Sequence, residues 1–120
     1  MITWNNMDTI TSYQELETAA RVNLAEAMTG EKGAWRVKKY SVPMAEGLVY
    51  HYAAKQVDDT VLDALKKLAD EAQLAEKFKA LYSGEVINTG EKRLVLHHMT
   101  RGQLGDAVIA DGVDKRTFYK

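Results

Sequence analysis

The clearest hydrophobic pattern in the chain lies between residues 58 and 72. Four apolar side chains recur there at the i, i+4, i+7 and i+11 spacing of one helix face: Val61, Leu65, Leu68 and Ala72. Asp58 or Asp59 can cap the first turn, and Asp63 and Lys67 are spaced to pair on the exposed side. The pattern therefore predicts an amphipathic helix.

A second helix is predicted directly after the first. One stripe carries its apolar side chains: Leu74, Phe78, Leu81 and Tyr82. Gly84 stands where a helix C-terminus favours glycine. The linker is so short that the two helices should be neighbours. We expect the centre of one core to be formed by Leu65, Leu68, Phe78 and Leu96.

The first thirty residues contain two helix start signals. Ser12 and Glu15 form a capping box, which predicts a helix beginning there. Asn23 and Glu26 form a second box, and Gly30 can end the segment. The pattern is compatible with one bent helix or with two short ones.

The period changes from helical to alternating at Trp35. Trp35 and Val37 alternate with polar residues, and residues 48–52 (LVYHY) are rich in β-branched and aromatic side chains. Two antiparallel strands are predicted, with a turn at Glu46 and Gly47, and with Pro43 at an edge or strand end. A lone hairpin is marginal in water, so its apolar face should rest on helices.

The last third of the chain predicts one more helix and a small hairpin. Asn88 to Glu91 resembles a helix start, followed by a short apolar helix that ends by Gly102. Gly102 and Gly105 mark a loop. Residues 108–113 (VIADGV) predict a hairpin, because Asp-Gly supplies the positive φ of a type I′ turn.

The final residues place Phe118 and Tyr119 at the chain end without a cap, a glycine or a polar tail. This pattern indicates an element interrupted in mid-structure. The elements together predict an α+β fold, mostly helical, in which amphipathic helices pack with one hairpin and a second small hairpin lies near the C-terminus.

Composition narrows the class of protein. The 120 residues are 46% hydrophobic and 28% charged, which suits one soluble globular domain, and no second domain is expected. The net charge of −1 means that the chain has no excess of positive charge with which to bind nucleic acid or an anionic membrane. There is no cysteine, no apolar span and no targeting segment, so a cytoplasmic protein is expected.

The histidines give no metal signal. His97 and His98 are adjacent and project about 100° apart on a helix, so they do not form an i, i+4 ligand pair. We expect His97 to be a core residue bonded to backbone, His98 to be partly exposed, and His51 to face solvent.

An acid–base site with a phosphate-binding cation is conceivable at Glu85, Glu91 and Arg93, but structural roles are favoured. Glu91 already serves the predicted cap, Arg93 can pair with a neighbouring acid or carbonyl, and Arg101 suits a helix C-terminus. The glycines form no phosphate-binding motif. The sequence thus predicts no catalytic, cofactor-binding or metal-binding residue.

Residues 84–101 read GEVINTGEKRLVLHHMTR, which resembles the pattern G-E-K-I-N-x-T-E-x-R-A-V-L-H-x-A-L-R of the glucose-6-phosphate isomerase (phosphoglucose isomerase) family. The matching positions are Gly84, Glu85, Ile87, Asn88, Glu91, Arg93, Val95, Leu96, His97 and Arg101. The departures are Val86, Gly90, Leu94, Met99 and Thr100. Residues 48–57 and 108–112 are similar to two further family segments.

The resemblance implies the N-terminal, non-catalytic portion of an isomerase that interconverts glucose 6-phosphate and fructose 6-phosphate in glycolysis and gluconeogenesis. The family's phosphate site and catalytic residues lie in later segments that this sequence does not contain. The implied partners are the remainder of the isomerase polypeptide and a second subunit, with the phosphosugar bound only by the intact enzyme. The alternative is a stand-alone binding or oligomerisation module.

Overall fold

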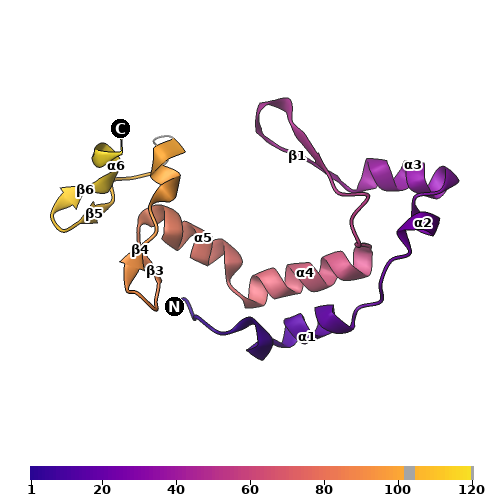
Figure 1. Cartoon of the computed structure of the whole chain (residues 1–120), viewed down its shortest axis with the longest axis horizontal. Helices are drawn as coiled ribbons and strands as arrows, with labels where there is room; N and C mark the ends of the chain where they lie inside the picture. Colours follow the sequence, from indigo (N-terminus) through magenta and orange to yellow (C-terminus); the bar gives the residue numbers. More distant parts are fainter. Residues whose placement is uncertain (102–104, 120) are drawn as a thin grey trace. The chain divides into compact units, whose positions relative to one another are not determined.

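The computed structural model describes residues 1–101 and 105–119. The chain divides into two compact units, Met7–Leu68 in one and Met1–Asn6 with Ala69–Lys120 in the other. Helices alternate with three two-stranded antiparallel sheets (Figure 1). The expected α+β, mostly helical class is therefore confirmed.

The unit Met7–Leu68 contains helices and one hairpin, which projects away from them (Figure 1). Its elements are η1 (Met7–Thr9), α1 (Thr11–Thr18), α2 (Leu24–Ala27), α3 (Gly30–Lys39), β1 (Ser41–Pro43), η2 (Ala45–Gly47), β2 (Val49–His51) and most of α4 (Asp59–Glu71). Its buried apolar side chains are Ile10, Tyr40, Ala53, Val61 and Ala64.

The two predicted start signals near the N-terminus have different outcomes. Ile10, and not Ser12, occupies the cap of α1, and Ser12 lies buried inside the helix, so the first capping box is wrong. The second signal is confirmed, because the Asn23 side chain accepts a hydrogen bond from the Glu26 N–H and begins α2. Of the two readings left open, two short helices are observed.

The predicted strand from Trp35 is wrong, because these residues belong to α3. The alternation there covers too few positions to outweigh the helical spacing of Arg36 and Tyr40, which are both buried. The basic last turn of α3 also suits the helix C-terminus. Gly33 allows close packing at the start of α3, since a Cβ there would lie 2.3 Å from the Met28 carbonyl oxygen.

The antiparallel hairpin itself is confirmed, with its first strand beginning at Ser41. Val42 pairs with Tyr50, and Pro43 ends β1 as expected. Glu46 and Gly47 form the turn with positive φ values of 57° and 75°. The expectation that helices cover the hairpin is wrong for the described residues, because the side chains of β2 are all exposed.

The helix α4 begins where the sequence predicts. Its cap is Asp58, whose Oδ1 accepts a hydrogen bond of 2.9 Å from the Val61 N–H. Lys67 pairs with Glu15 of α1 at 3.1 Å, and not with Asp63. A partner on a packed neighbouring helix has replaced the local pairing that sequence spacing suggested.

The other unit contains a long helix followed by short elements. They are α5 (Leu74–Ser83), β3 (Val86–Asn88), β4 (Arg93–Leu94), η3 (His97–Arg101), β5 (Ile109–Ala110), β6 (Val113–Asp114) and α6 (Lys115–Phe118). Gly84 ends α5 with φ of 76°, as predicted, and a Cβ there would lie 2.1 Å from Val108 Cγ1. Ala80, Met99 and Val108 are buried.

The helix predicted after Asn88 is wrong, since β3, β4 and the 3₁₀ helix η3 occupy that stretch. Asn88 does accept a hydrogen bond from the Glu91 N–H at 3.1 Å, but this bond closes a hairpin turn. An Asn side chain can accept this hydrogen bond both at a helix cap and in a turn. Here the chain turns instead of continuing as a helix, because Lys92 adopts a left-handed φ of 53°.

The C-terminal hairpin is confirmed, with Asp111 and Gly112 at φ of 54° and 73°. Asp114 caps the N-terminus of α6 by accepting from the Arg116 N–H at 3.0 Å. Phe118 is exposed. The predicted loop glycine Gly102 and the last residue of the predicted interrupted element lie outside the described residues.

The predicted core centre is wrong, because none of its four members is fully buried and they divide between the two units. Leu65 is 39% exposed and Phe78 is 58% exposed, whereas Leu68 and Leu96 are half-buried. Smaller side chains, Val61, Ala64 and Ala80, hold the buried positions on these helices. The apolar stripes of α4 and α5 are therefore only partly covered by the described residues.

Met99 is 1% exposed and fills the centre of its unit. We expect Met99→Ala to lower the free energy of unfolding by about 2–5 kcal/mol through lost burial and a residual cavity. Phe78→Ala is the matched control, and its cost should be well below that of Met99→Ala because the ring is mostly exposed. Urea denaturation of both variants checks this, and equal losses would contradict the assigned core.

Candidate functional site

A buried arginine organises the region around α3. Arg36 is 5% exposed, and its Nε donates to the Ala53 carbonyl at 2.7 Å. Its Nη2 donates to the carbonyls of Lys55, at 2.9 Å, and Val57. The guanidinium also lies 4.6 Å from the centre of the Tyr40 ring. Arg36 thus ties α3 to the irregular segment that joins β2 to α4.

A second polar cluster fixes the end of α3 to the start of α4. The Tyr40 hydroxyl donates to Asp59 Oδ1 at 3.1 Å, and the Lys39 ammonium pairs with Asp59 Oδ2. The hydrogen bond from Lys39 lowers the pKa of the Asp59 carboxyl, and the same bond raises the pKa of Lys39. Burial raises the pKa of Tyr40, and its bond to Asp59 adds to the rise. All three groups keep their usual charge at neutral pH.

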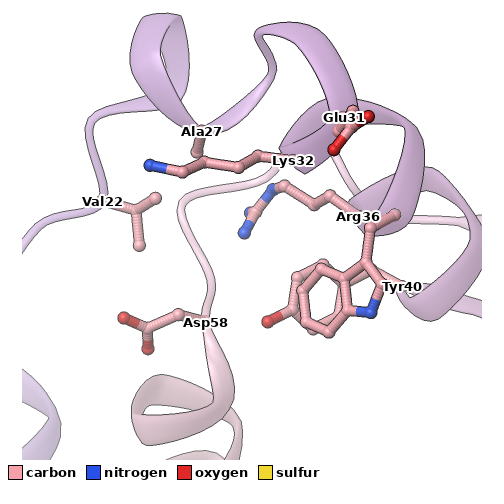
Figure 2. A pocket seen from close by; sticks show the side chains of 8 residues that line it. Val22, Ala27, Glu31, Lys32, Arg36, Tyr40 and Asp58 are labelled. Atoms are coloured by element: carbon pink, nitrogen blue, oxygen red, sulfur yellow. The ribbon is translucent and has the colours of Figure 1, made fainter.

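A cavity of about 530 Å³ opens beside these two clusters, and Figure 2 shows the side chains around it. Its lining combines apolar, aromatic and oppositely charged groups: Val22, Ala27, Glu31, Lys32, Trp35, Arg36, Tyr40 and Asp58. The Trp35 indole meets Tyr40 edge-on at 6.1 Å, and Lys39 covers it at 4.5 Å.

Two of the four charged groups that line this cavity already have structural tasks. Asp58 caps α4, and the Arg36 Nε and Nη2 donors serve three carbonyls. Two acids and two bases line the cavity, so the charges balance. The arrangement suits an apolar or aromatic group packed against Trp35 and Tyr40, and it offers no activated nucleophile or acid–base pair.

The prediction that His97 is a core residue is wrong, whereas His98 is half-buried and His51 is exposed, both as expected. His97 is exposed, and its carbonyl accepts from the Thr100 hydroxyl at 2.8 Å. His98 is the inner residue, with its ring 4.6 Å from that of Tyr82 and both ring nitrogens buried without a hydrogen-bond partner in the described structure. The prediction assumed an α-helix, whereas η3 directs these side chains differently.

The three other candidate residues do not converge on a site. Glu91 Oε2 accepts from the Asn88 amide at 3.1 Å and lies 3.9 Å from Arg93 Nη1, so the predicted pairing of Arg93 with a neighbouring acid is confirmed. Glu85 accepts from the Ser83 hydroxyl at 3.4 Å. All these residues except Asn88 are exposed. Within the described ranges, no three metal-ligating side chains cluster.

Arg116 is the residue that sequence reasoning missed. It is 5% exposed and donates to the carbonyls of Tyr82, at 2.8 Å, and Asp106. Its approach also requires Gly105, where a Cβ would lie 2.9 Å from Arg116 Nη2. No local pattern announces such an arginine, because its carbonyl partners are distant in sequence or lie in a loop.

None of the helices in the described part of the chain is long and apolar enough to cross a bilayer. The features so far define a mostly helical α+β segment whose polar residues hold its own backbone together. The sequence profile of the phosphoglucose isomerase family matches residues 51–118, and the chain belongs to this family.

Curated relatives agree with this assignment. A glucose-6-phosphate isomerase of Treponema denticola is 48% identical over 97% of this chain, and the match covers 23% of that relative. The Borreliella burgdorferi glucose-6-phosphate isomerase is 38% identical over all of this chain and 22% of its own length. The Pseudomonas aeruginosa relative is 40% identical over 66% of this chain. The chain corresponds to an N-terminal portion of these relatives and spans less than a quarter of the first two.

Removing Arg36 should loosen the unit that it organises. Arg36→Met leaves one buried and two part-buried carbonyls without this donor, and we expect it to cost about 2–4 kcal/mol of unfolding free energy. Lys38→Met, an exposed change on the same helix, should stay within about 0.5 kcal/mol. Chemical denaturation compares the two. A small loss for Arg36→Met would show that the bonds do not organise the fold.

Asp59 should make stability depend on pH. Its pKa is lowered in the folded state, so its contribution is present above the ordinary value of about 3.9 and is lost as pH falls through the folded value. Asp59→Asn should lower the urea midpoint at neutral pH, and the difference from wild type should shrink below about pH 4. Asp63→Asn on the same helix is the control. A difference that persists unchanged in acid would contradict the Lys39–Asp59 account.

Proposed function

We propose that this chain serves as a structural, non-catalytic portion of a glucose-6-phosphate isomerase. Interconversion of glucose 6-phosphate and fructose 6-phosphate then belongs to an enzyme in which further polypeptide joins this segment. The observation that carries the proposal is the coverage: nearly all of this chain matches the Treponema denticola isomerase, but only 23% of that relative is matched.

The chemistry of the described residues supports this role. The acids and bases that could have formed a site are committed to structure: Asp58 to a cap, Asp59 to Lys39 and Tyr40, and Glu91 to a turn. Proton transfer on a phosphosugar needs a base and a phosphate-binding group within hydrogen-bond reach of one substrate. We therefore propose no catalytic, cofactor-binding or metal-binding residue in this chain.

The proposal includes the setting of the intact enzyme. Its substrate would be a phosphosugar in glycolysis and gluconeogenesis, its location the cytoplasm, and its assembly a homodimer. These features are drawn from the family resemblance. They concern the whole isomerase and not the isolated segment.

The alternative is a stand-alone binding or oligomerisation module. The observation that favours it is that each of the two compact units has its own buried side chains, such as Tyr40 in one and Met99 in the other. Separate cores would let the segment fold without the polypeptide that accompanies it in the relatives.

A split-enzyme experiment tests the proposal. The Treponema denticola relative is produced without the segment that this chain matches, either alone or together with this chain, and isomerase activity is measured in a coupled assay. We expect little activity from either part alone and restored activity from the pair, because the chain supplies missing support for the catalytic body.

Two results would contradict the proposal. One is turnover by this chain alone that survives repurification. The other is failure of the pair to associate and to regain activity, while the chain alone forms a stable oligomer; this outcome would favour the stand-alone module. An unrelated helical domain of similar length serves as the control for general stabilisation.

A further inference from the structure

One face of the β1–β2 hairpin is apolar from end to end. Side chains alternate between the faces of a strand, and directly paired residues share a face. Val42 is paired with Tyr50, and the next pair is linked by the Met44 N–H donating to the Leu48 carbonyl at 2.7 Å. We call the following set the hairpin face: Val42, Met44, Leu48, Tyr50 and Tyr52.

Ring contacts confirm that the two tyrosines of the hairpin face lie on one side. The rings of Tyr50 and Tyr52 stack with centroids 5.9 Å apart, and Tyr52 continues the contact to the buried Tyr40 at 5.6 Å. The hairpin face is therefore anchored at one end on α3. Its other end consists of Met44 and Leu48 beside the turn.

The hairpin face is uncovered in the described structure. Leu48 is 64% exposed, Met44 57% and Tyr50 49%. At its anchored end the face continues into a groove of about 400 Å³, which is lined by Tyr50, Tyr52, Lys55, Val57, Leu62 and Leu65. One cation at the groove, Lys55, is the only charge in a lining that is otherwise apolar or aromatic.

The opposite face of the same hairpin has a different character. It carries Ser41, Pro43, Val49 and His51. Both faces are open to solvent, so their difference in chemistry, and not in exposure, distinguishes them. A continuous apolar face beside a mixed one marks a surface that is covered in the working protein.

We propose that the hairpin face and its groove dock the polypeptide that accompanies this segment in glucose-6-phosphate isomerases. This inference rests on the proposed function and names the surface through which it operates. The occupant follows from the length of the relatives: in the Treponema denticola enzyme this segment is 23% of the chain, so most of that polypeptide is available to cover the face. The part of the accompanying polypeptide that contacts the hairpin face is apolar, because it must match the apolar lining of the groove.

Thiol labelling tests the docking surface at single residues, because this chain has no cysteine of its own. Leu48→Cys places a thiol on the hairpin face, and Val49→Cys is the matched control, an adjacent and half-exposed residue on the opposite face. Each variant is co-produced with the Treponema denticola relative that lacks the matched segment. The purified complex is treated with a maleimide, and labelling of this chain is followed by mass spectrometry.

In the isolated chain both thiols should react at similar rates. In the complex, Leu48→Cys should react at least about tenfold more slowly, whereas Val49→Cys should stay within about twofold of its free rate. Tyr50→Lys should weaken the complex, since it places a charge in the apolar contact.

Each other outcome has a defined meaning. A complex with restored activity in which Leu48→Cys reacts as fast as in the free chain overturns the docking surface but leaves the proposed function in place. If the labelling of Leu48→Cys in the isolated chain becomes slower as the protein concentration rises, a second copy of the chain covers this face. That result also overturns the inference. Absence of any complex overturns the proposed function itself.

Discussion

Two buried guanidinium groups hold the irregular backbone of this protein, and the regular elements depend on them. A buried cation is costly unless hydrogen bonds compensate it, and carbonyl groups in irregular segments need donors that no helix or strand supplies. Arg36 and Arg116 each donate to carbonyls in their own unit, although Arg116 Nη1 is buried without a hydrogen-bond partner in the described structure. The hydrogen bonds from Arg36 fix the segment between β2 and α4 up to Val57. The next residue, Asp58, is thereby placed to cap α4.

This arrangement explains why the hairpin face is presented to solvent. Tyr40 contacts both the Arg36 guanidinium and the ring of Tyr52, so the base of the hairpin is held, whereas the side chains at its tip are exposed. Large apolar side chains are exposed on α4 and α5 as well, including Leu65 and Phe78. The polar groups named here bond to the segment's own backbone and side chains, and the exposed apolar surface is what the proposed docking of another polypeptide would cover.

Sequence reasoning predicted the features that depend on neighbouring residues. The cap at Asp58, the C-terminal glycine Gly84 and the Asp111–Gly112 turn all follow from local backbone geometry, and so were found. The failures share a different cause. At residues 35–39 a short alternation was outweighed by packing of Arg36, and at Asn88 one hydrogen-bond pattern serves both caps and turns. The roles of His97 and His98, and of Arg116, depend on distant contacts that spacing does not encode.

The most direct test of this account is a structure of the assembled enzyme that contains this chain. The account predicts that Leu48 and Met44, which are 64% and 57% exposed here, are buried against the accompanying polypeptide, with the Arg36 bonds to Ala53 and Lys55 retained. An assembled structure in which the hairpin face stays in solvent, while another surface of the chain makes the contact, would contradict it.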